Sequence, residues 1–250
     1  MPHSQHQFFA PCPRGLEVVL AEELTALGAQ SAQASDAGAT FQGDFSLAMR
    51  VNLESRIASR VLWQLATGAY TNEQQIYEAA RQLPWSQWIR AEQTLMVDLN
   101  AHRCPLRSLD FVTLRIKDAV CDYFMEHGNS RPSVDTRQPD VRIHAFLNEQ
   151  HYFLYLDTSG DALFKRGSRL ESGVAPIKKN LAAGILQLAG WQPGTPLLDP
   201  FCGAGTFLVE AAERSLQRAP GLGRTFGFER LAGWDQAEWG RNKAAAEARA

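Results

Sequence analysis

The sequence is short of the features that mark secreted, membrane and metal-binding proteins. Its 250 residues contain only four cysteines, Cys12, Cys104, Cys121 and Cys202, and no two of them form a Cys-x-x-Cys pair. That spacing indicates neither a disulfide framework nor a zinc site. No apolar run approaches the roughly 20 residues that span a bilayer, and no secretory signal opens the chain. We therefore expect a cytoplasmic protein with no metal and no membrane partner.

Two nucleotide-binding motifs are also missing. No Gly-x-x-x-x-Gly-Lys-Ser/Thr run occurs in the chain, which makes a triphosphate-binding loop of that kind unexpected. The dinucleotide fingerprint requires a third glycine three residues after Gly205, and that place is taken by Leu208. NAD and FAD are therefore disfavoured as cofactors.

A glycine-rich segment is nevertheless present towards the end of the chain. Residues 197–198 end a short apolar run, which predicts a buried strand, and Gly203 and Gly205 then allow a tight turn close to a ligand. An amphipathic pattern starts at Thr206, so the free amides of a helix N-terminus would face that ligand. We expect Cys202 to be a small buried residue rather than a nucleophile. The alternative is a structural strand-turn-helix that contains two convenient glycines.

Charge is unevenly distributed along the chain. The net charge is -2, but residues 101–180 hold twelve Lys/Arg and ten Asp/Glu, which makes the middle of the chain basic. Five cations with a single nearby acid, Glu171, lie just ahead of the glycine loop: Lys165, Arg166, Arg169, Lys178 and Lys179. Such a cluster suits a phosphate backbone. The alternative is a solvated linker with scattered charge.

The hydrophobic periodicity predicts two kinds of architecture in one chain. Expected helices cover residues 15–26, 47–56, 73–83 and 109–124, and expected strands cover residues 39–43, 60–66, 94–100, 141–147 and 152–156. The order is mixed α+β up to about residue 157. A helix-strand-helix order of the doubly wound type begins only after Pro176. The length, about two average domains, and the 45% apolar content agree with more than one core.

Several segments carry a family resemblance over nearly all 250 residues. They are residues 8–17, 115–120, 131–135, 139–142, 157–160, 165–169, 175–183 and 190–200. With them the chain resembles the THUMP-containing RNA methyltransferases. The octet Asp-Pro-Phe-Cys-Gly-Ala-Gly-Thr at 199–206 resembles motif I of the class I S-adenosylmethionine-dependent methyltransferases, in the form typical of enzymes that methylate exocyclic amino groups of bases.

The resemblance implies an α+β N-terminal part followed by a truncated α/β domain. It places a ferredoxin-like module at residues 1–43, a THUMP RNA-binding domain at 44–158, a linker at 159–175 and the N-terminal part of a Rossmann-like class I methyltransferase domain at 176–250. The glycine loop lies too near Ala250 for one complete doubly wound domain to follow it. We therefore expect the chain to end inside its catalytic domain.

Within this family the chain is most similar to the bacterial enzymes that methylate N2 of a guanine in 23S ribosomal RNA. The resemblance implies S-adenosyl-L-methionine as cofactor and 23S rRNA, or its assembly intermediate, as partner; it leaves the oligomeric state open. Three alternatives remain: an RNA-binding module with an incomplete or degenerate methyltransferase tail, methylation of another RNA such as tRNA, and a small-molecule methyltransferase.

The resemblance also implies site residues. The cofactor-binding residues would be Ala175, Pro176, Asp199, Pro200, Phe201, Cys202, Gly203, Ala204, Gly205 and Thr206. The RNA-binding candidates are Arg115, Lys117, Arg131, Arg142, Lys165, Arg166 and Arg169. The family usually carries Ser in place of Ala204 and Glu in place of Lys179, so Lys179 receives no cofactor role. In relatives an Asn-Pro-Pro-Tyr motif holds the target base. This sequence lacks it, so we expect it beyond Ala250 and the 250 residues alone to be inactive.

Overall fold

The computed structural model describes residues 4–128, 130–166 and 177–250, and it divides into two compact units. The first unit is built from Met1–Val61, Asp161–Phe226 and Asp235–Ala250. The second is built from Leu62–Gly160 and Gly227–Trp234. The start of the expected catalytic domain therefore shares a unit with the N-terminal module, and the middle of the chain folds separately.

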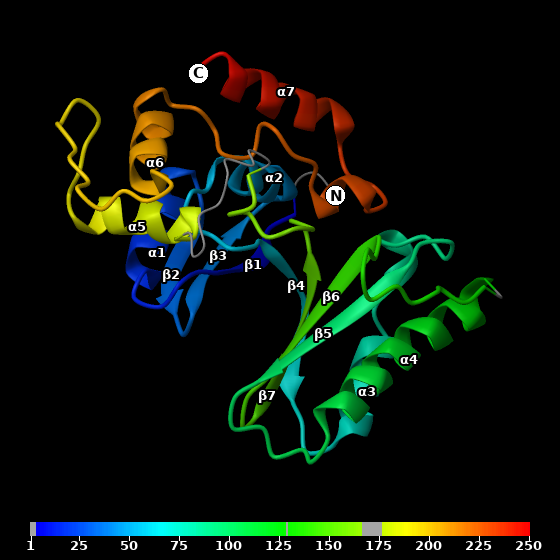
Figure 1. Cartoon of the computed structure of the whole chain (residues 1–250). Coiled ribbons are helices and arrows are strands. Elements are labelled where there is room, and N and C mark those ends of the chain that lie inside the picture. Colours follow the sequence, from blue (N-terminus) through cyan, green and yellow to red (C-terminus); the bar gives the residue numbers. More distant parts are fainter. Residues whose placement is uncertain (1–3, 129, 167–176) are drawn as a thin grey trace. The chain divides into compact units, whose positions relative to one another are not determined.

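The first unit contains an antiparallel sheet and helices from both ends of the chain (Figure 1). Its elements are β1 (His6–Pro11), α1 (Glu17–Ala26), β2 (Gln30–Ser35), β3 (Gly38–Gly43), α2 (Phe45–Glu54), α5 (Lys179–Leu188), α6 (Thr206–Ser215) and α7 (Gln236–Glu247). The strand order in this unit is β2-β3-β1, and Phe8 stacks on Phe41 across β1 and β3 with ring centroids 5.1 Å apart. Leu20 and Leu24 of α1 are fully buried in the same unit.

Local sequence explains how these elements begin and pair. Asp44 caps α2, because its side chain accepts a hydrogen bond from the Leu47 amide at 2.8 Å. Gly38 lies opposite Pro11 in the β1–β3 ladder, where a Cβ would stand 2.3 Å from the carbonyl oxygen of Ala10. Only glycine allows the two backbones to approach so closely.

The second unit is a mixed sheet covered on one face by α3 and α4 (Figure 1). Its elements are β4 (Leu62–Ala69), α3 (Glu73–Arg81), η1 (Trp85–Gln87), β5 (Leu95–Ala101), α4 (Leu109–Gly128), β6 (Val141–Leu147), β7 (His151–Asp157) and η2 (Gly227–Arg230). The strand order is β4-β7-β6-β5, with β5 and β6 parallel and the other pairs antiparallel. Alternate residues of β6 from Val141 to Leu147 are buried, as a sheet with one covered face requires.

The short segment 227–234 belongs to this second unit although it follows α6 in the sequence. The Phe228 amide donates to the Thr158 carbonyl at 2.9 Å, and the Ala232 amide donates to the Trp88 carbonyl at 2.8 Å. Phe228 is fully buried. The chain therefore returns to the middle unit before α7 completes the first one.

Most of the elements expected from periodicity are confirmed. The helices near residues 15–26, 47–56, 73–83 and 109–124 are α1 to α4, and the five expected strands are β3 to β7. Apart from the short 3-10 helices η1 and η2, three of the described elements were not anticipated. In β1 and β2 the sequence does not alternate cleanly, and five of the six residues of β2 are exposed. The third is α7, which lacks a strong apolar stripe.

The strand expected at residues 197–198 is wrong for this structure. Neither residue lies in a strand, and Leu198 is 88% exposed. A strand of a parallel sheet is stable only between hydrogen-bonded neighbours. No strand in the described part of the chain pairs with this segment. Within the described ranges, no helix is long and apolar enough to cross a membrane.

Candidate cofactor site

The glycine loop ahead of α6 is shaped by backbone conformations that suit glycine. Gly203 has a φ of 53° and Gly205 a φ of 70°, both in the left-handed region. Asp199 begins the turn by accepting a hydrogen bond from the Phe201 amide at 3.1 Å. The Gly205 amide then donates to the Cys202 carbonyl at 2.7 Å, which closes the loop. A residue with a Cβ would strain both glycine positions.

The first turn of α6 leaves donors for a ligand. Gly205 is the residue that precedes the helix, and no side chain caps this end. The first intrahelical bond joins the Val209 amide to the Gly205 carbonyl at 2.9 Å, so the amides of residues 206–208 precede the helical ladder. A Cβ built on Gly203 or Gly205 would meet no atom within 4 Å. The loop thus presents open space and free backbone donors, as a nucleoside-type cofactor requires.

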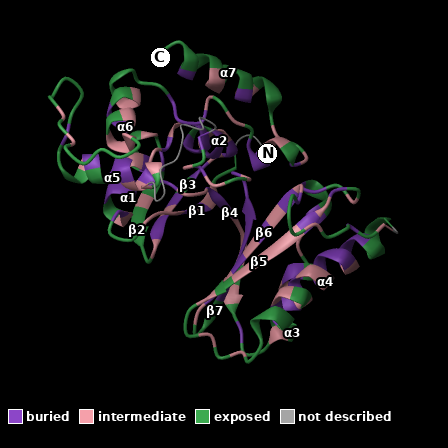
Figure 2. Cartoon of the chain, in the orientation of Figure 1, coloured by how far each residue is buried: buried purple, intermediate pink, exposed green. Residues whose placement is uncertain are grey.

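The loop itself is exposed, as the green segment between α5 and α6 shows (Figure 2). Phe201 is 94% exposed. Cys202 is exposed as well, which corrects the expectation of a small buried filler. Pro200 and Ala204 are also exposed, whereas Asp199 and Thr206 are half-buried.

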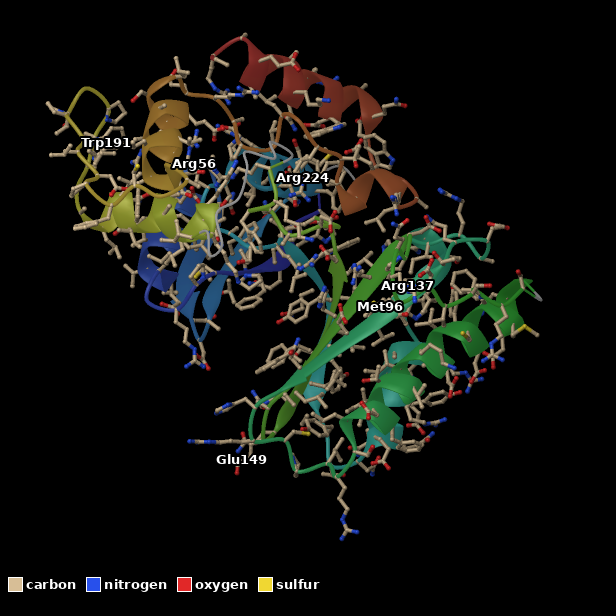
Figure 3. All side chains as sticks on the ribbon, viewed as in Figure 1. Arg56, Met96, Arg137, Glu149, Trp191 and Arg224 are labelled. Carbon is tan, nitrogen blue, oxygen red and sulfur yellow. The ribbon has the colours of Figure 1, made fainter. Side chains whose placement is uncertain are left out.

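A small apolar cluster lies beneath the loop. It consists of Leu186 on α5, Trp191 in the turn after α5 and Ala211 on α6, with Leu197 and Phe207 packed against it. Trp191, labelled in Figure 3, donates its indole N–H to the Thr195 carbonyl at 3.1 Å. This cluster joins α5 to α6 and carries the turn that leads into the glycine loop.

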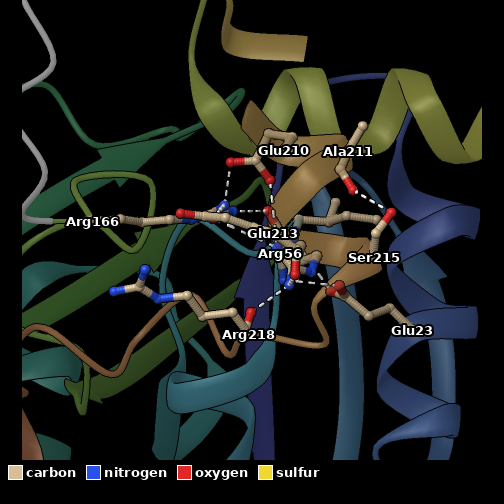
Figure 4. A network of polar contacts seen from close by, with 9 residues as sticks. Glu23, Arg56, Arg166, Glu210, Ala211, Glu213, Ser215 and Arg218 are labelled. Carbon is tan, nitrogen blue, oxygen red and sulfur yellow. Dashed lines mark hydrogen bonds and ion pairs between the residues drawn. The ribbon is translucent and has the colours of Figure 1, made fainter. Parts of the chain in front are cut away.

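A cluster of buried charges holds the other side of α6 (Figure 4). It consists of Arg56, Arg166, Glu210 and Glu213. Glu210 is 1% exposed, forms a close ion pair with Arg166, and lies 3.7 Å from Nη1 of Arg56. Glu213 lies 3.8 Å from Arg56 and 3.6 Å from Arg166. Burial lowers the pKa of Arg56, and the carboxylates of Glu210 and Glu213 oppose that shift.

A pocket of about 390 Å³ opens beside this cluster, between α1, α5 and α6. Among the described residues, Nη1 of Arg56 and Oε2 of Glu210 are buried without a hydrogen-bond partner, and both side chains line the pocket. Water in such a polar pocket would satisfy both groups. The cluster is therefore a structural ion-pair network with room for solvent.

Arg166 is a correction to the RNA-binding residues expected from the sequence. Its side chain is 2% exposed, pairs with Glu210 and donates from Nη2 to the Arg56 carbonyl at 2.9 Å. A phosphate group cannot reach a guanidinium that is closed off in this way. Its neighbour Lys165 does remain exposed, with a loose ion pair to Asp161 at 3.6 Å. The basic run therefore divides into one buried and one accessible cation at adjacent positions.

Four other RNA-binding candidates lie in the second unit. Arg115 on α4 packs over the ring of Tyr77 at 3.9 Å and donates to Gln74 at 2.6 Å, so it joins α4 to α3. Lys117 is half-buried beside Asp118. Arg131 is 61% exposed and 3.9 Å from Asp118. Arg142 on β6 lies 3.4 Å from Asp98. Of these four, Arg131 is the most accessible.

Three of the expected site residues, Ala175, Pro176 and Arg169, lie outside the described residues. The supports of the loop were missed by sequence reasoning, because Arg56 and Glu213 are 157 positions apart and neither stands in a recognisable motif. The only local signal was the pair of acids on one face of the expected helix after Thr206. Among the described residues, no group of three or more His, Cys, Asp or Glu side chains is placed to hold a metal ion.

Comparison with known families divides the chain into three domains. Residues 7–62 match the RlmL ferredoxin-like domain, residues 70–157 the THUMP domain and residues 166–250 the RMKL-like methyltransferase domain. The chain therefore matches the ferredoxin-like, THUMP and methyltransferase domains that its resemblance implied. The ferredoxin-like match extends to residue 62, beyond the boundary expected at residue 43.

Individual relatives agree with this class. The chain is 45% identical over 230 residues to the Ribosomal RNA large subunit methyltransferase K/L of Cellvibrio japonicus, covering 90% of this chain and 31% of that protein. The chain spans about a third of the length of the curated relatives it matches.

Solved structures share the fold closely. One structure, from Listeria monocytogenes, is described as a predicted N6-adenine-specific DNA methylase and matches with a TM-score of 0.89 at 28% identity. The match covers 98% of the present chain and 64% of the Listeria chain. The methyltransferase SMU.472, solved with SAH, has the same TM-score and identity and covers 100% of this chain and 66% of that one.

Proposed function

We propose that the chain is part of a protein that transfers a methyl group from S-adenosyl-L-methionine to N2 of a guanine in 23S ribosomal RNA. The observation that carries the proposal is the open glycine loop at residues 203–206 ahead of an uncapped helix, found in a chain 45% identical to a methyltransferase named for the large-subunit rRNA. A cytoplasmic location follows from such a substrate.

The residues of the loop fit the cofactor. S-adenosylmethionine would supply an electrophilic methyl group on its sulfonium. The backbone at Gly203 and Gly205 would let the cofactor approach, and the first-turn amides of α6 would donate to its polar groups. Asp199 shapes the turn through its bond to the Phe201 amide. The similar structure of SMU.472 was solved with SAH, the molecule that S-adenosylmethionine becomes after it has donated its methyl group.

RNA would be bound by the THUMP domain, with a contribution from the linker that follows it. Among the expected contacts that the structure describes, Arg131 of the THUMP domain and Lys165 of the linker are the accessible cations, at 61% and 64% side-chain exposure. Each contact between a cation and a phosphate makes the affinity for RNA fall more steeply as the salt concentration rises. If Arg131 and Lys165 contact phosphates, Arg131→Ala and Lys165→Ala should each flatten the slope of log affinity against log salt.

We also propose that the 250 residues do not catalyse methyl transfer by themselves. The sequence contains no Asn-Pro-Pro-Tyr, and Leu198 and Phe201 beside the loop lie open to solvent. A methylation assay on ribosomal RNA would compare this chain with the chain extended to the length of its curated relatives. We expect product only from the extended protein, and comparable rates would refute the proposal.

A different nucleic-acid target is the second candidate. The Listeria structure is described as an adenine-specific DNA methylase, and its fold matches this chain at a TM-score of 0.89. Transfer to tRNA is a further candidate, and so is an RNA-binding role with an incomplete methyltransferase part. Identification of the methylated nucleoside separates these targets from guanine N2, and the absence of any cofactor binding would favour the binding role.

Cys202 offers a direct test of the cofactor site, since its thiol is exposed inside the loop. We expect S-adenosylmethionine to slow the reaction of Cys202 with a maleimide, and calorimetric titration to show binding. Gly205→Val should abolish both effects, because valine resists a φ of 70°. Unchanged labelling at saturating cofactor, with no heat of binding, would contradict the proposal.

A further inference from the structure

We infer that Arg56 is a positioning residue for the cofactor loop, which it fixes by anchoring α6 through Glu210 and Glu213. The inference rests on the proposed function, since it assigns a role to the N-terminal module in building the cofactor site. Arg56 follows α2, whereas α6 belongs to the methyltransferase match at residues 166–250. A single side chain of one domain thus holds the helix that starts the site of another.

The contacts of Arg56 reach both side chains and backbone of α6. Nη1 lies 3.7 Å from Glu210 and 3.8 Å from Glu213. Nη2 donates to the carbonyl of Glu213 at 3.1 Å and also to the carbonyl of Arg218 just beyond the helix (Figure 4). The carbonyl of Glu213 belongs to the last turn of α6, so the cation of Arg56 lies at the negative end of the helix dipole and interacts favourably with it.

Arg56 is itself held in place from its backbone. Its amide donates to Oε1 of Glu23 on α1 at 2.8 Å, and the hydroxyl of Ser55 donates to Oε2 at 2.6 Å. Its carbonyl accepts the bond from Arg166 at 2.9 Å. The backbone of Arg56 is therefore fixed to Glu23 of α1 on one side and to Arg166 on the other. It has little freedom to follow a shift of α6.

The anchor acts on the loop because α6 is short and rigid. Glu210 lies one turn after Thr206, on the same helix face, and a ten-residue helix is only about 15 Å long. Ala211 packs another side of α6 against Leu186 and Trp191. With both sides held, the position of the first turn is determined, and so is the position of the amides that would bind the cofactor. A displacement of about 1 Å is enough to impair a reaction that depends on alignment.

Two further polar and steric contacts strengthen the same junction. Asn180 at the start of α5 is 1% exposed and donates to the carbonyl of Ile57 at 3.2 Å. A Cβ on Gly184 of α5 would stand 2.3 Å from a methyl carbon of Leu16, so α5 meets the N-terminal module at close range. The N-terminal module thus supports α5 and α6 together, and Arg56 is the part of that support that reaches α6.

The test uses Arg56→Ala, the milder Arg56→Lys and the matched control Arg50→Ala. Arg50 is an arginine of α2 in the same module, 44% exposed and paired with Glu54 at 3.2 Å. Lysine keeps the charge but cannot contact two carboxylates and two carbonyls at once. All proteins are compared under conditions where circular dichroism shows the folded state. If Arg56→Ala does not fold, Arg56→Lys and Glu213→Gln carry the test.

Hydrogen exchange gives the readout that needs no cofactor. The amides of Gly205 and Val209 close the loop and the first turn, so their exchange reports the order of this segment. We expect exchange at these amides to be about tenfold faster in Arg56→Ala, with a smaller change in Arg56→Lys and none in Arg50→Ala. A purely structural ion pair would change global stability and leave this segment unaffected. Unchanged exchange in the folded Arg56 variants would overturn the inference.

Cofactor binding separates this inference from the proposed function. We expect Arg56→Ala to weaken S-adenosylmethionine binding about tenfold, as when an outer partner of a binding group is removed, while RNA affinity is unchanged. Equal cofactor affinity in wild type and Arg56→Ala would overturn the positioning role. If the wild-type chain binds no cofactor but exchange at the loop still depends on Arg56, the proposed function fails and the anchoring of the loop stands.

Discussion

Replacement of Arg166 by alanine should destabilise the first unit strongly. Arg166 and Glu210 are 2% and 1% exposed, and they form a close ion pair inside the charge cluster. Arg166 also contacts Glu213 at 3.6 Å and the Arg56 carbonyl at 2.9 Å. Removal of the guanidinium leaves Glu210 buried beside the more distant cation of Arg56, 3.7 Å away.

The structure sets the size of the effect. Breaking a buried ion pair by removing one partner costs about 3–5 kcal/mol, because the remaining charge is uncompensated. The pocket beside Glu210, of about 390 Å³, is large enough for water, and Arg56 remains, so we expect the lower end of that range, about 3 kcal/mol. Replacing both partners, as in Arg166→Met with Glu210→Leu, should cost less than the single change, because the buried carboxylate of Glu210 is then removed together with its cation, while Arg56 keeps Glu213 at 3.8 Å.

The assay is urea unfolding of the first unit, with Lys165→Ala as the matched control. Lys165 stands next to Arg166 in the chain, but its side chain is 64% exposed and its ion pair with Asp161 is open to solvent. Exposed pairs contribute about 0–1 kcal/mol, so the control should retain wild-type stability. A loss of less than about 1 kcal/mol in Arg166→Ala, or an equal loss in both variants, would refute the buried position of Arg166.

Three further predictions address other parts of the molecule. Burial, with the carboxylates of Glu17 and Glu23, raises the pKa of Cys12 to about 12, so a maleimide near neutral pH should label Cys202 well before Cys12; equal rates by peptide mass mapping would contradict this. Burial also raises the pKa of Glu23, so its contribution to the free energy of unfolding is full below its unfolded value of about 4.3 and is lost as pH rises through the raised value. In urea unfolding from pH 4 to 7, the free energy of unfolding of the wild type should fall relative to that of Glu23→Gln as pH rises. The opposite trend would contradict the raised pKa of Glu23. Gly227→Ala should destabilise the second unit by about 1–3 kcal/mol, because its Cβ would lie 2.8 Å from the backbone nitrogen of Gly160; unchanged thermal unfolding would refute the close approach.

Periodicity predicted the elements whose burial is local and regular. β6 alternates between buried and half-buried residues, and α4 presents an apolar stripe that includes Ile116 and Val120, so both could be identified from the sequence. β2 could not, since its six residues are held by pairing with β3 and carry no apolar face. The strand expected at 197–198 shows the converse. An apolar dipeptide forms a strand only where partner strands exist.

The glycine loop was predictable because its conformation depends on individual glycines at positions with positive φ. Gly203 and Gly205 adopt the positive φ angles that their positions implied, and α6 begins at Thr206 as expected. The supports of the loop were not predictable, because charge alone does not distinguish a buried cation from an exposed one. Lys165 and Arg166 looked alike in the sequence, and only the carboxylates of α6 separate them.

The central claim is that this loop belongs to an enzyme that methylates N2 of guanine in ribosomal RNA. In the most direct measurement, the chain, extended to the length of its curated relatives, is incubated with labelled S-adenosylmethionine and protein-free 23S rRNA. The methylated nucleoside is then identified by chromatography and mass spectrometry. We predict label in N2-methylguanosine, which is lost with Gly205→Val. Label in N6-methyladenosine, or in no nucleoside at all, would contradict the account.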